Sequence, residues 1–399
     1  MYLLKVRCSI IAPFELVEYQ ARWRRLHQAL KRRELDAILV SNPANINWLT
    51  GYDAWSFYTP QAMLVEVGGT PVWFGREMDA ASAKSSSILH PEHLAPWPEE
   101  LVQHPTVHPS DHIGATLEAR GLNGKRIGYE SDADFLSIRM LSAIKTQLPQ
   151  AQWIDADLIV NWLRLVKSPA ELIYMTQAAQ IAGHSMDAAL AAARPGARQC
   201  DVMAEAVAAQ IRGTPEFGGD MTALHPLMLA GTSASAAHPM WTDAPLDIDN
   251  AVAFELGGCR KRYNAGLART AYLGKPTQSA LDVSKTVQEG MEAVLDTLRA
   301  GVSAGDVHAA WQSVLDRYGL EKKSRIGYSI GVGYGPDWGE HTVSFRPGET
   351  VLIPEDATVH IILAMWMQDW GLELSETIHV KAGGAQCLTT YPRDLHVIE

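Results

Sequence analysis

The first third of the chain alternates between helical and strand-like hydrophobic patterns. Apolar positions within residues 15–33 are spaced as on one side of a surface helix. Short apolar runs follow at Asp36–Val40, Ala62–Val67, Pro71–Phe74 and Arg126–Glu130, separated by polar segments. Such runs are typical of buried strands. The pattern therefore predicts a layered α/β domain.

The second part of the chain opens with a helix whose start is clearly marked. Ser168, Pro169 and Glu171 form a capping-box sequence, and the helical pattern that follows is stopped by Pro195-Gly196. Further helices are predicted at 198–212, 280–299 and 304–318, and strands at Ala251–Leu256, Arg269–Leu273, Val351–Ile353 and Thr358–Met367. Helices combined with mostly antiparallel strands predict an α+β domain.

Length and composition indicate a globular protein of two domains, which we place at 1–160 and 161–399 of the 399 residues. The formal charge of −11 disfavours nucleic acid and anionic membranes as partners. Four scattered cysteines without a C-x-x-C pair are typical of reduced thiols. No secretory leader and no apolar run of ~18 residues is visible, which predicts a cytoplasmic protein.

Five sequence motifs carry a resemblance to a known family. They are WLRLVKSPAEL at 162–172, His238 before a proline, AFELGGCRKRYNAGLARTAYLG at 253–274, GYSIG at 327–331 and LELSETIHV at 372–380. In this order and spacing the chain resembles the creatinase/methionine-aminopeptidase family. The resemblance implies an α+β pita-bread catalytic domain preceded by a creatinase-type N-terminal α/β domain.

The positions at which metal-dependent members of that family hold two divalent ions have changed here. The matching residues are Glu255, Gly266, Tyr328, a residue at or near Ile362, and Ser375. Glycine and isoleucine have no ligating atom, and tyrosine and serine are poor replacements for histidine and glutamate. One remaining carboxylate cannot hold a two-metal cluster, so we expect a site without metal or other cofactor.

Glu255 and His238 are the predicted catalytic residues. Glu255 lies in an apolar strand, where a carboxylate is paired, neutral or kept for chemistry. It could act as a nucleophile or general base. The alternative is a structural carboxylate held by Arg260 or Arg269. His238 matches a family histidine that serves in substrate binding or proton transfer, which fits the pKa of imidazole, although a histidine next to proline is often only a satisfied polar group.

Further residues are candidates for binding the substrate. Glu340 and His341 follow a glycine-rich loop and could supply charge to a cationic ligand, and Tyr328 stands at the family's histidine position. Aromatic residues could wall a cation site, although such side chains more often serve packing. These aromatic candidates are Tyr52, Trp55, Phe57 and Tyr58 in the N-terminal domain and Trp338, Trp366 and Trp370 in the C-terminal one.

Within the family, the motifs GYDAWSFY, GTSASAAHPMW, AFELGG and GYSIGVGYGPDWGE resemble those of ectoine hydrolases. The two positions that would bind a guanidinium in creatinase are Ala268 and Leu374 here. The resemblance implies a small zwitterionic, ectoine-like substrate whose amidinium ring is opened to N-acetyl-2,4-diaminobutyrate. Glu255 would attack the amidinium carbon or activate water, and His238 would protonate the leaving nitrogen.

Other functions remain open from the sequence. They are a metal-dependent X-Pro peptidase, a different metal-free amidinohydrolase or lyase acting on small zwitterions, and a scaffold that has lost catalysis. Two-domain members of the family are commonly homodimers in which the N-terminal domain covers the partner's active site. The resemblance therefore implies a homodimer, with Tyr52 to Tyr58 contributing in trans.

Overall fold

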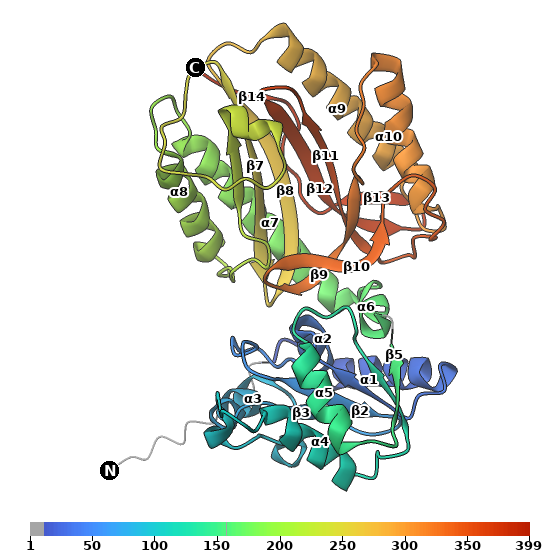
Figure 1. The fold of residues 1–399 in the computed structure, drawn as a ribbon. Coiled ribbons are helices and arrows are strands. Elements are labelled where there is room, and N and C mark those ends of the chain that lie inside the picture. Colours follow the sequence, from blue (N-terminus) through green and yellow to red (C-terminus); the bar gives the residue numbers. More distant parts are fainter. Residues whose placement is uncertain (1–11, 157) are drawn as a thin grey trace. The chain divides into compact units, whose positions relative to one another are not determined.

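The computed structural model describes residues 12–156 and 158–399 and divides into two compact units, Met1–Leu163 and Arg164–Glu399. Each unit has its own sheet and its own hydrophobic core (Figure 1). In the described residues, no helix combines the length and apolarity that crossing a bilayer requires.

The N-terminal unit is a five-stranded sheet with the order β3-β2-β1-β4-β5. Strands β1 and β2 are antiparallel, as are β2 and β3, whereas β4 runs parallel to both β1 and β5. Helix and strand bounds are α1 Leu16–Arg32, β1 Ala37–Val40, α2 Pro43–Thr50, β2 Ala62–Glu66, β3 Val72–Phe74, α3 Ala80–Ser86, α4 Pro109–Ala119, β4 Arg126–Tyr129, α5 Ile138–Gln147, β5 Gln152–Asp155 and α6 Ile159–Arg164. The predicted helix and four strands are confirmed, and the α/β assignment with them.

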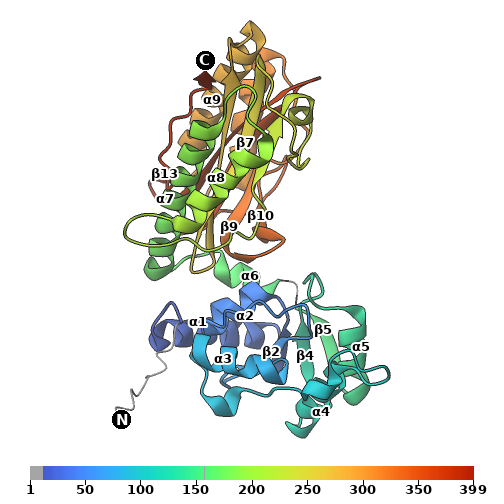
Figure 2. The same cartoon turned by 90° about the vertical axis from the view of Figure 1, so that its left-hand side faces the viewer.

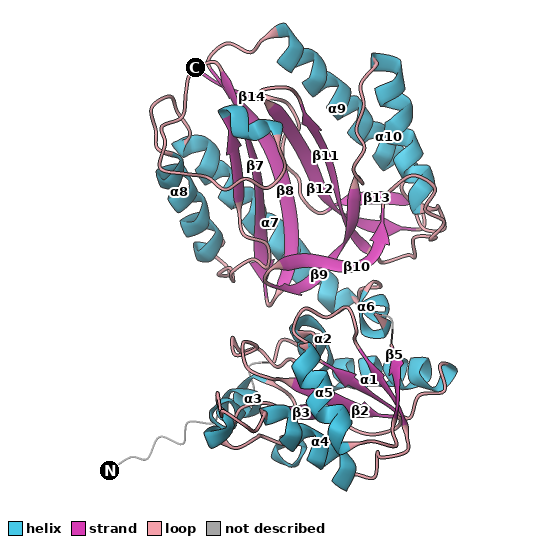
Figure 3. Cartoon of the chain, viewed as in Figure 1, coloured by secondary structure: helices cyan, strands magenta, loops and turns pink. Residues whose placement is uncertain are grey.

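The C-terminal unit is built on a larger, mostly antiparallel sheet, in which the order β13-β12-β11-β9-β8-β7-β6 is joined by β10 and β14 (Figure 3). Its elements are α7 Pro169–Ala192, α8 Gln199–Arg212, β6 Leu227–Ala230, β7 Asn250–Arg260, β8 Tyr263–Leu273, α9 Gln278–Thr297, α10 Ala304–Tyr318, β9 Gly327–Tyr334, β10 Asp337–Ser344, β11 Thr358–Trp366, β12 Gly371–Lys381, β13 Gly384–Cys387 and β14 His396–Ile398.

The capping box at the start of α7 is confirmed. The Ser168 hydroxyl accepts from the Glu171 N–H at 3.3 Å, and the Glu171 carboxylate accepts from the Ser168 N–H at 2.8 Å. The predicted strand at Val351–Ile353 is wrong. Only Leu352 pairs there, in an isolated bridge with Ser303, because the segment lies between turns instead of along a neighbouring strand.

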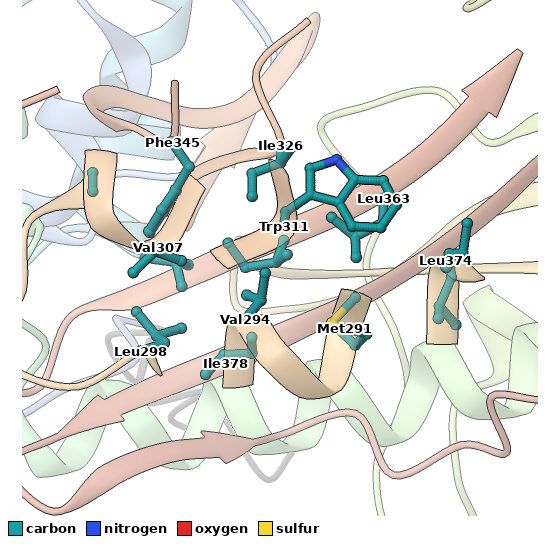
Figure 4. Packing of buried hydrophobic residues seen from close by; sticks show 14 of the residues in the cluster. Met291, Val294, Leu298, Val307, Trp311, Ile326, Phe345, Leu363, Leu374 and Ile378 are labelled. Atoms are coloured by element: carbon teal, nitrogen blue, oxygen red, sulfur yellow. The ribbon is translucent and has the colours of Figure 1, made fainter. Parts of the chain in front are cut away.

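Two helix pairs cover one side of the C-terminal sheet. Helix α7 packs on β7 and β8, with α8 beside it (Figure 2). Helix α9 packs on β11, β12 and β13, with α10 beside it (Figure 1). Trp311 of α10 is fully buried in the hydrophobic core that includes Val294 and Leu363 (Figure 4). Its ring lies close to Gly290 of α9. A Cβ at Gly290 would lie 2.0 Å from Trp311 Cζ3, so only glycine permits this approach.

Strand alternation divides the side chains of this sheet between two faces. Val252, Phe254 and Leu256 of β7 and Val359, Ile361 and Leu363 of β11 belong to the cores beneath the helices. Because successive residues of a strand point to opposite faces, the residues between them point away from the helix layer. Glu255 and His360 are among these, and we call this side the site face.

Candidate active site

Glu255 is a buried carboxyl without a partner on the site face. In the sheet, Glu255 of β7 pairs with Leu227 of β6 on one side and with Ala268 of β8 on the other. Within the described part of the chain, the Glu255 side chain forms no hydrogen bond or ion pair. The predicted structural alternative fails, because Arg269 binds Glu376 at 2.8 Å and Arg260 bonds to Gln177 and Gly218.

A second carboxyl, Glu373 of β12, lies close enough to interact with Glu255. Burial raises the pKa of Glu255, and the negative charges of Glu373 and Asp337 raise it further. Burial also raises the pKa of Glu373, whose Oε2 is buried without a hydrogen bond, whereas Lys322 lowers it. Because two buried carboxyls repel one another when both are ionised, the pair keeps a proton near neutral pH. Ordinary glutamates have lost their protons at that pH.

An imidazole occupies the space next to Gly266. A Cβ at Gly266 would lie 2.8 Å from both Cε1 and Nε2 of His360, so a side chain at this position would displace the ring. His360 Nε2 lies 2.7 Å from the Ser375 hydroxyl, and Nδ1 lies 3.2 Å from the Tyr328 hydroxyl. Burial lowers the pKa of His360 to about 3, against the opposing effect of Asp337, so the ring is neutral at physiological pH.

The Trp338 indole fills further space between the strands of the site. Its Nε1 donates to the Tyr328 hydroxyl at 2.8 Å, and Cζ3 would lie 2.5 Å from a Cβ at Gly257. Burial and the nearby Glu255 raise the pKa of Tyr328, so the hydroxyl remains protonated. Trp338, Tyr328 and His360 thus form one buried polar cluster beside the two glycines.

The residues of this site do not fit the pair of divalent ions that metal-dependent members of the family hold. The described residues contain no group of three or more His, Cys, Asp or Glu side chains able to hold a metal. Gly266 is closed by His360, Tyr328 is a protonated phenol, and Ser375 is bonded to His360 and to the Ala268 N–H, which lies 2.6 Å away. A hard divalent ion needs several anionic or carbonyl oxygens, which this arrangement does not supply.

The sequence candidates Glu340 and His341 have partners of their own. The Glu340 carboxylate is completely buried, and both oxygens accept from Lys167 Nζ at 2.9 Å. His341 is exposed and bonds to Asp337 at 2.9 Å. This geometry favours a structural ion pair for Glu340, and the structure does not bring it to Glu255.

His238 follows a short 3₁₀ segment that packs on the site face. Ala234 of that segment contacts Ala253, two residues before Glu255 on β7. His238 itself is exposed, has a positive φ of 65° and forms no hydrogen bond within the described part of the chain. The segment lies on the correct face, and the catalytic role of His238 stays a prediction.

Tyr52 and Trp55 belong to the N-terminal unit. Tyr52 is buried, and its hydroxyl bonds to Ser56 and to Gln61. Trp55 is 59% exposed and packs against Phe57 with ring centroids 4.7 Å apart. Of the two, Trp55 therefore has a ring face open to a ligand.

Trp366 lies on the site face of β11, two residues beyond Ala364, which pairs with Glu373. The Lys322 ammonium lies 4.2 Å from the centroid of the Trp366 ring. Sequence reasoning missed Lys322, Glu373 and His360. The alternation of LELSE on β12 and of TVHII on β11 marks Glu373 and His360 as facing the same side as Glu255, but only the strand pairing brings them together.

Comparisons with known proteins agree with this architecture. Residues 22–166 match the creatinase/prolidase N-terminal domain, and residues 174–382 match metallopeptidase family M24. An ectoine hydrolase of Halomonas elongata is 36% identical over 98% of this chain and 99% of its own length. An uncharacterized hydrolase/peptidase of Sinorhizobium fredii, y4tM, is 38% identical over 97% and 99%.

Solved structures of distant relatives share the fold. A prolidase of Thermococcus sibiricus superimposes with a TM-score of 0.83 at 15% identity, covering 95% of this chain and 99% of its own. A dipeptidase of Pyrococcus horikoshii gives a TM-score of 0.80 at 19% identity, covering 94% and 100%. The expected pita-bread domain behind a creatinase-type N-terminal domain is confirmed. This chain is a member of metallopeptidase family M24.

Proposed function

We propose that this protein is a hydrolase that opens the ring of ectoine, and of 5-hydroxyectoine, to N-acetyl-2,4-diaminobutyrate in compatible-solute catabolism, without a metal ion. The observation that carries the proposal is the unpaired, buried Glu255 beside Glu373, on a face where Gly266, Tyr328 and Ser375 replace metal ligands. The similarity to an ectoine hydrolase along nearly the whole chain supports the same substrate.

The chemistry suits a carboxyl without a metal. At neutral pH the ectoine ring is a delocalised amidinium, whose central carbon is already electrophilic. A Glu255 oxygen attacks this carbon, forming a C–O bond while the C=N electron pair moves to a ring nitrogen. That nitrogen takes a proton and its C–N bond breaks. Water then releases the product from Glu255, so one water molecule is consumed per turnover.

Two groups are available for the proton transfer. His238 is our proposed acid/base, and the Glu373 carboxyl, whose pKa is raised by burial, is a second proton store directly beside Glu255. In the alternative route, Glu255 removes a proton from water, and the water attacks the same carbon. The two routes differ in whether Glu255 becomes covalently modified.

Three measurements test the proposal. Purified protein treated with a chelator is incubated with ectoine, and ring opening is followed by NMR; absence of turnover contradicts the proposal. Acid-quenched enzyme is then digested and analysed by mass spectrometry. A substrate adduct on the Glu255 peptide establishes covalent attack, and its absence during steady turnover favours activation of water. His238→Ala and Glu373→Gln, assayed in parallel, show which residue supplies the proton.

A metal-dependent X-Pro peptidase is the second candidate, because the fold is shared with a prolidase and a dipeptidase. The replaced ligand positions argue against it. Hydrolysis of an X-Pro dipeptide that depends on added Mn²⁺ or Zn²⁺, in the absence of ectoine turnover, would favour the peptidase.

A further inference from the structure

Lys322 is a buried cation without an anion bonded to it in the described residues, and its charge interacts with the Glu373 carboxyl only from a distance. The side chain belongs to the segment between α10 and β9, and its residue is only 9% exposed. In the described part of the chain, Lys322 Nζ forms no hydrogen bond and no ion pair, and its contact is the face of Trp366 at 4.2 Å. A buried ammonium ordinarily has an anionic or carbonyl partner.

This ammonium lines an open pocket next to the proposed site. The pocket has a volume of about 350 Å³ and is lined by residues of the 321–324 segment together with Ala364, Met365 and Trp366. Ala364 and Trp366 point to the site face, and Ala364 pairs directly with Glu373. Lys322 and Glu373 interact electrostatically, and Glu373 interacts with Glu255. Lys322 at this pocket therefore lies within electrostatic range of the carboxyl pair.

The Trp366 ring face is already occupied by a cation of the protein itself. A second cation placed there would meet the charge of Lys322, so this part of the site does not suit the amidinium of the substrate. Arg325, three residues further along, lies over the Tyr328 ring at 4.7 Å and adds positive charge to the same side. The opposite end of the site, at Glu255 and Glu373, is acidic.

We propose that Lys322, held against Trp366, is the specificity-determining residue that binds the carboxylate of the substrate, while the ring cation faces Glu255 and Glu373. The inference rests on the proposed function for the identity of the substrate, and on the described geometry for the anion site. A zwitterion is then oriented by two opposite charges, and a cyclic amidine without a carboxylate is a poor substrate. Burial lowers the pKa of Lys322 to about 8, whereas Glu373 raises it, so a bound anion would recover part of the cost of burying the charge.

The kinetic test compares Lys322→Met with Lys381→Met. Lys381, at the end of β12, carries the same charge, is exposed and does not line the pocket. Lys322→Met raises the KM for ectoine roughly 10–100-fold with little change in kcat, as expected for loss of a charge-assisted contact. Lys322→Arg restores part of the affinity, and Lys381→Met behaves as wild type.

A neutral substrate separates recognition from general damage. With the carboxamide of ectoine, wild type and Lys322→Met have similar kcat/KM values, because the group that Lys322 binds is missing. An equal loss on both substrates, an unchanged KM for ectoine, or a KM effect found in Arg325→Met instead would overturn the proposal.

An equilibrium experiment tests the anion site without turnover. Lysines are labelled with ¹³C at Cε, and Lys322 is assigned as the NMR signal missing from Lys322→Met. Acetate raises the titration midpoint of this signal in wild type and in Lys381→Met, since an anion stabilises the charged ammonium. If acetate has no effect, the anion site is wrong, whatever the turnover. If acetate acts and ectoine is not hydrolysed, the proposed function is wrong and the anion site stands.

Discussion

At the scale of single residues, burial shifts the pKa values of several groups in the site away from their ordinary values. Glu255 and Glu373 are buried together without cations bonded to them, and the pKa of each is raised. His360 is held neutral by burial. Such an arrangement costs folding free energy and concentrates at functional sites. Replacing Glu255 therefore tests catalysis and stability together.

We expect Glu255→Gln to abolish ring opening and to stabilise the fold. Replacing the buried carboxyl by an uncharged amide should increase the free energy of unfolding by on the order of 1–3 kcal/mol at pH 8. Because the pKa of Glu255 is raised in the folded state, wild type loses stability as pH increases from its unfolded pKa toward its folded pKa. The gain in Tm measured by calorimetry should thus be larger at pH 8 than at pH 5. A variant less stable than wild type at both pH values would contradict this account.

The pH dependence of kcat/KM should report the carboxyl pair. Glu255 must be ionised to attack or to activate water, so the rate rises with pH through its pKa. Burial, and repulsion by Glu373, place this rise in rate near or above neutral pH. The ordinary pKa of glutamate is about 4.3. Glu373→Gln removes one negative charge and shifts the rise to lower pH in any activity that remains. A rise near pH 4 in wild type would exclude Glu255 as the titrating group.

At the scale of elements, the pairing of β8, β9, β11 and β12 brings packed side chains together on the site face. Tyr328 pairs with His360, and Ile362 pairs with Ser375, so these residues share the site face. The His360 ring reaches across to Gly266 on β8. The rings of His360, Tyr328 and Trp338 thus fill the space between these strands.

Gly266→Ala should destabilise the C-terminal unit by roughly 1–3 kcal/mol, because its Cβ would lie 2.8 Å from the His360 ring. Urea denaturation measures the loss. Gly383→Ala is the matched control, since a Cβ there has nothing within 4 Å.

The double variant Gly266→Ala with His360→Ala measures the coupling free energy between these two positions. Removing the ring first should make Gly266→Ala nearly neutral. Additive effects of the two substitutions would show that His360 does not occupy the space beside Gly266.

At the scale of the whole molecule, the chain has the two-domain family fold, and the proposed reaction needs no metal ion. Dialysis against a chelator should leave the rate of ectoine hydrolysis unchanged, and added Mn²⁺ or Zn²⁺ should not increase it. Elemental analysis of the active protein should find no stoichiometric metal. Loss of activity that is restored by one of these ions would contradict a metal-free site.

We also propose that the protein is a homodimer in which the exposed Trp55 acts on the partner's site. The Glu255→Gln and Trp55→Ala variants are each expected to have low hydrolase activity. Refolded together in equal amounts, they should form mixed dimers with one intact site, giving about a quarter of wild-type activity by random assortment. No recovery on mixing, despite mixed dimers detected by native mass spectrometry, would place Trp55 in cis or outside the site.

The sequence by itself determined the local elements. The capping box at Ser168, the helix periodicity and the apolar strand around Glu255 depend on neighbours in the chain, and they were predicted correctly. The sequence also shows a glycine at 266 and a serine at 375, which the family resemblance places at metal-ligand positions. Only the tertiary structure decided that Glu373 adjoins Glu255, that His360 fills the space at Gly266, and that Glu340 is already bound to Lys167. These facts depend on strand register and on burial, which are set by residues far apart in the sequence, so no local pattern contains them.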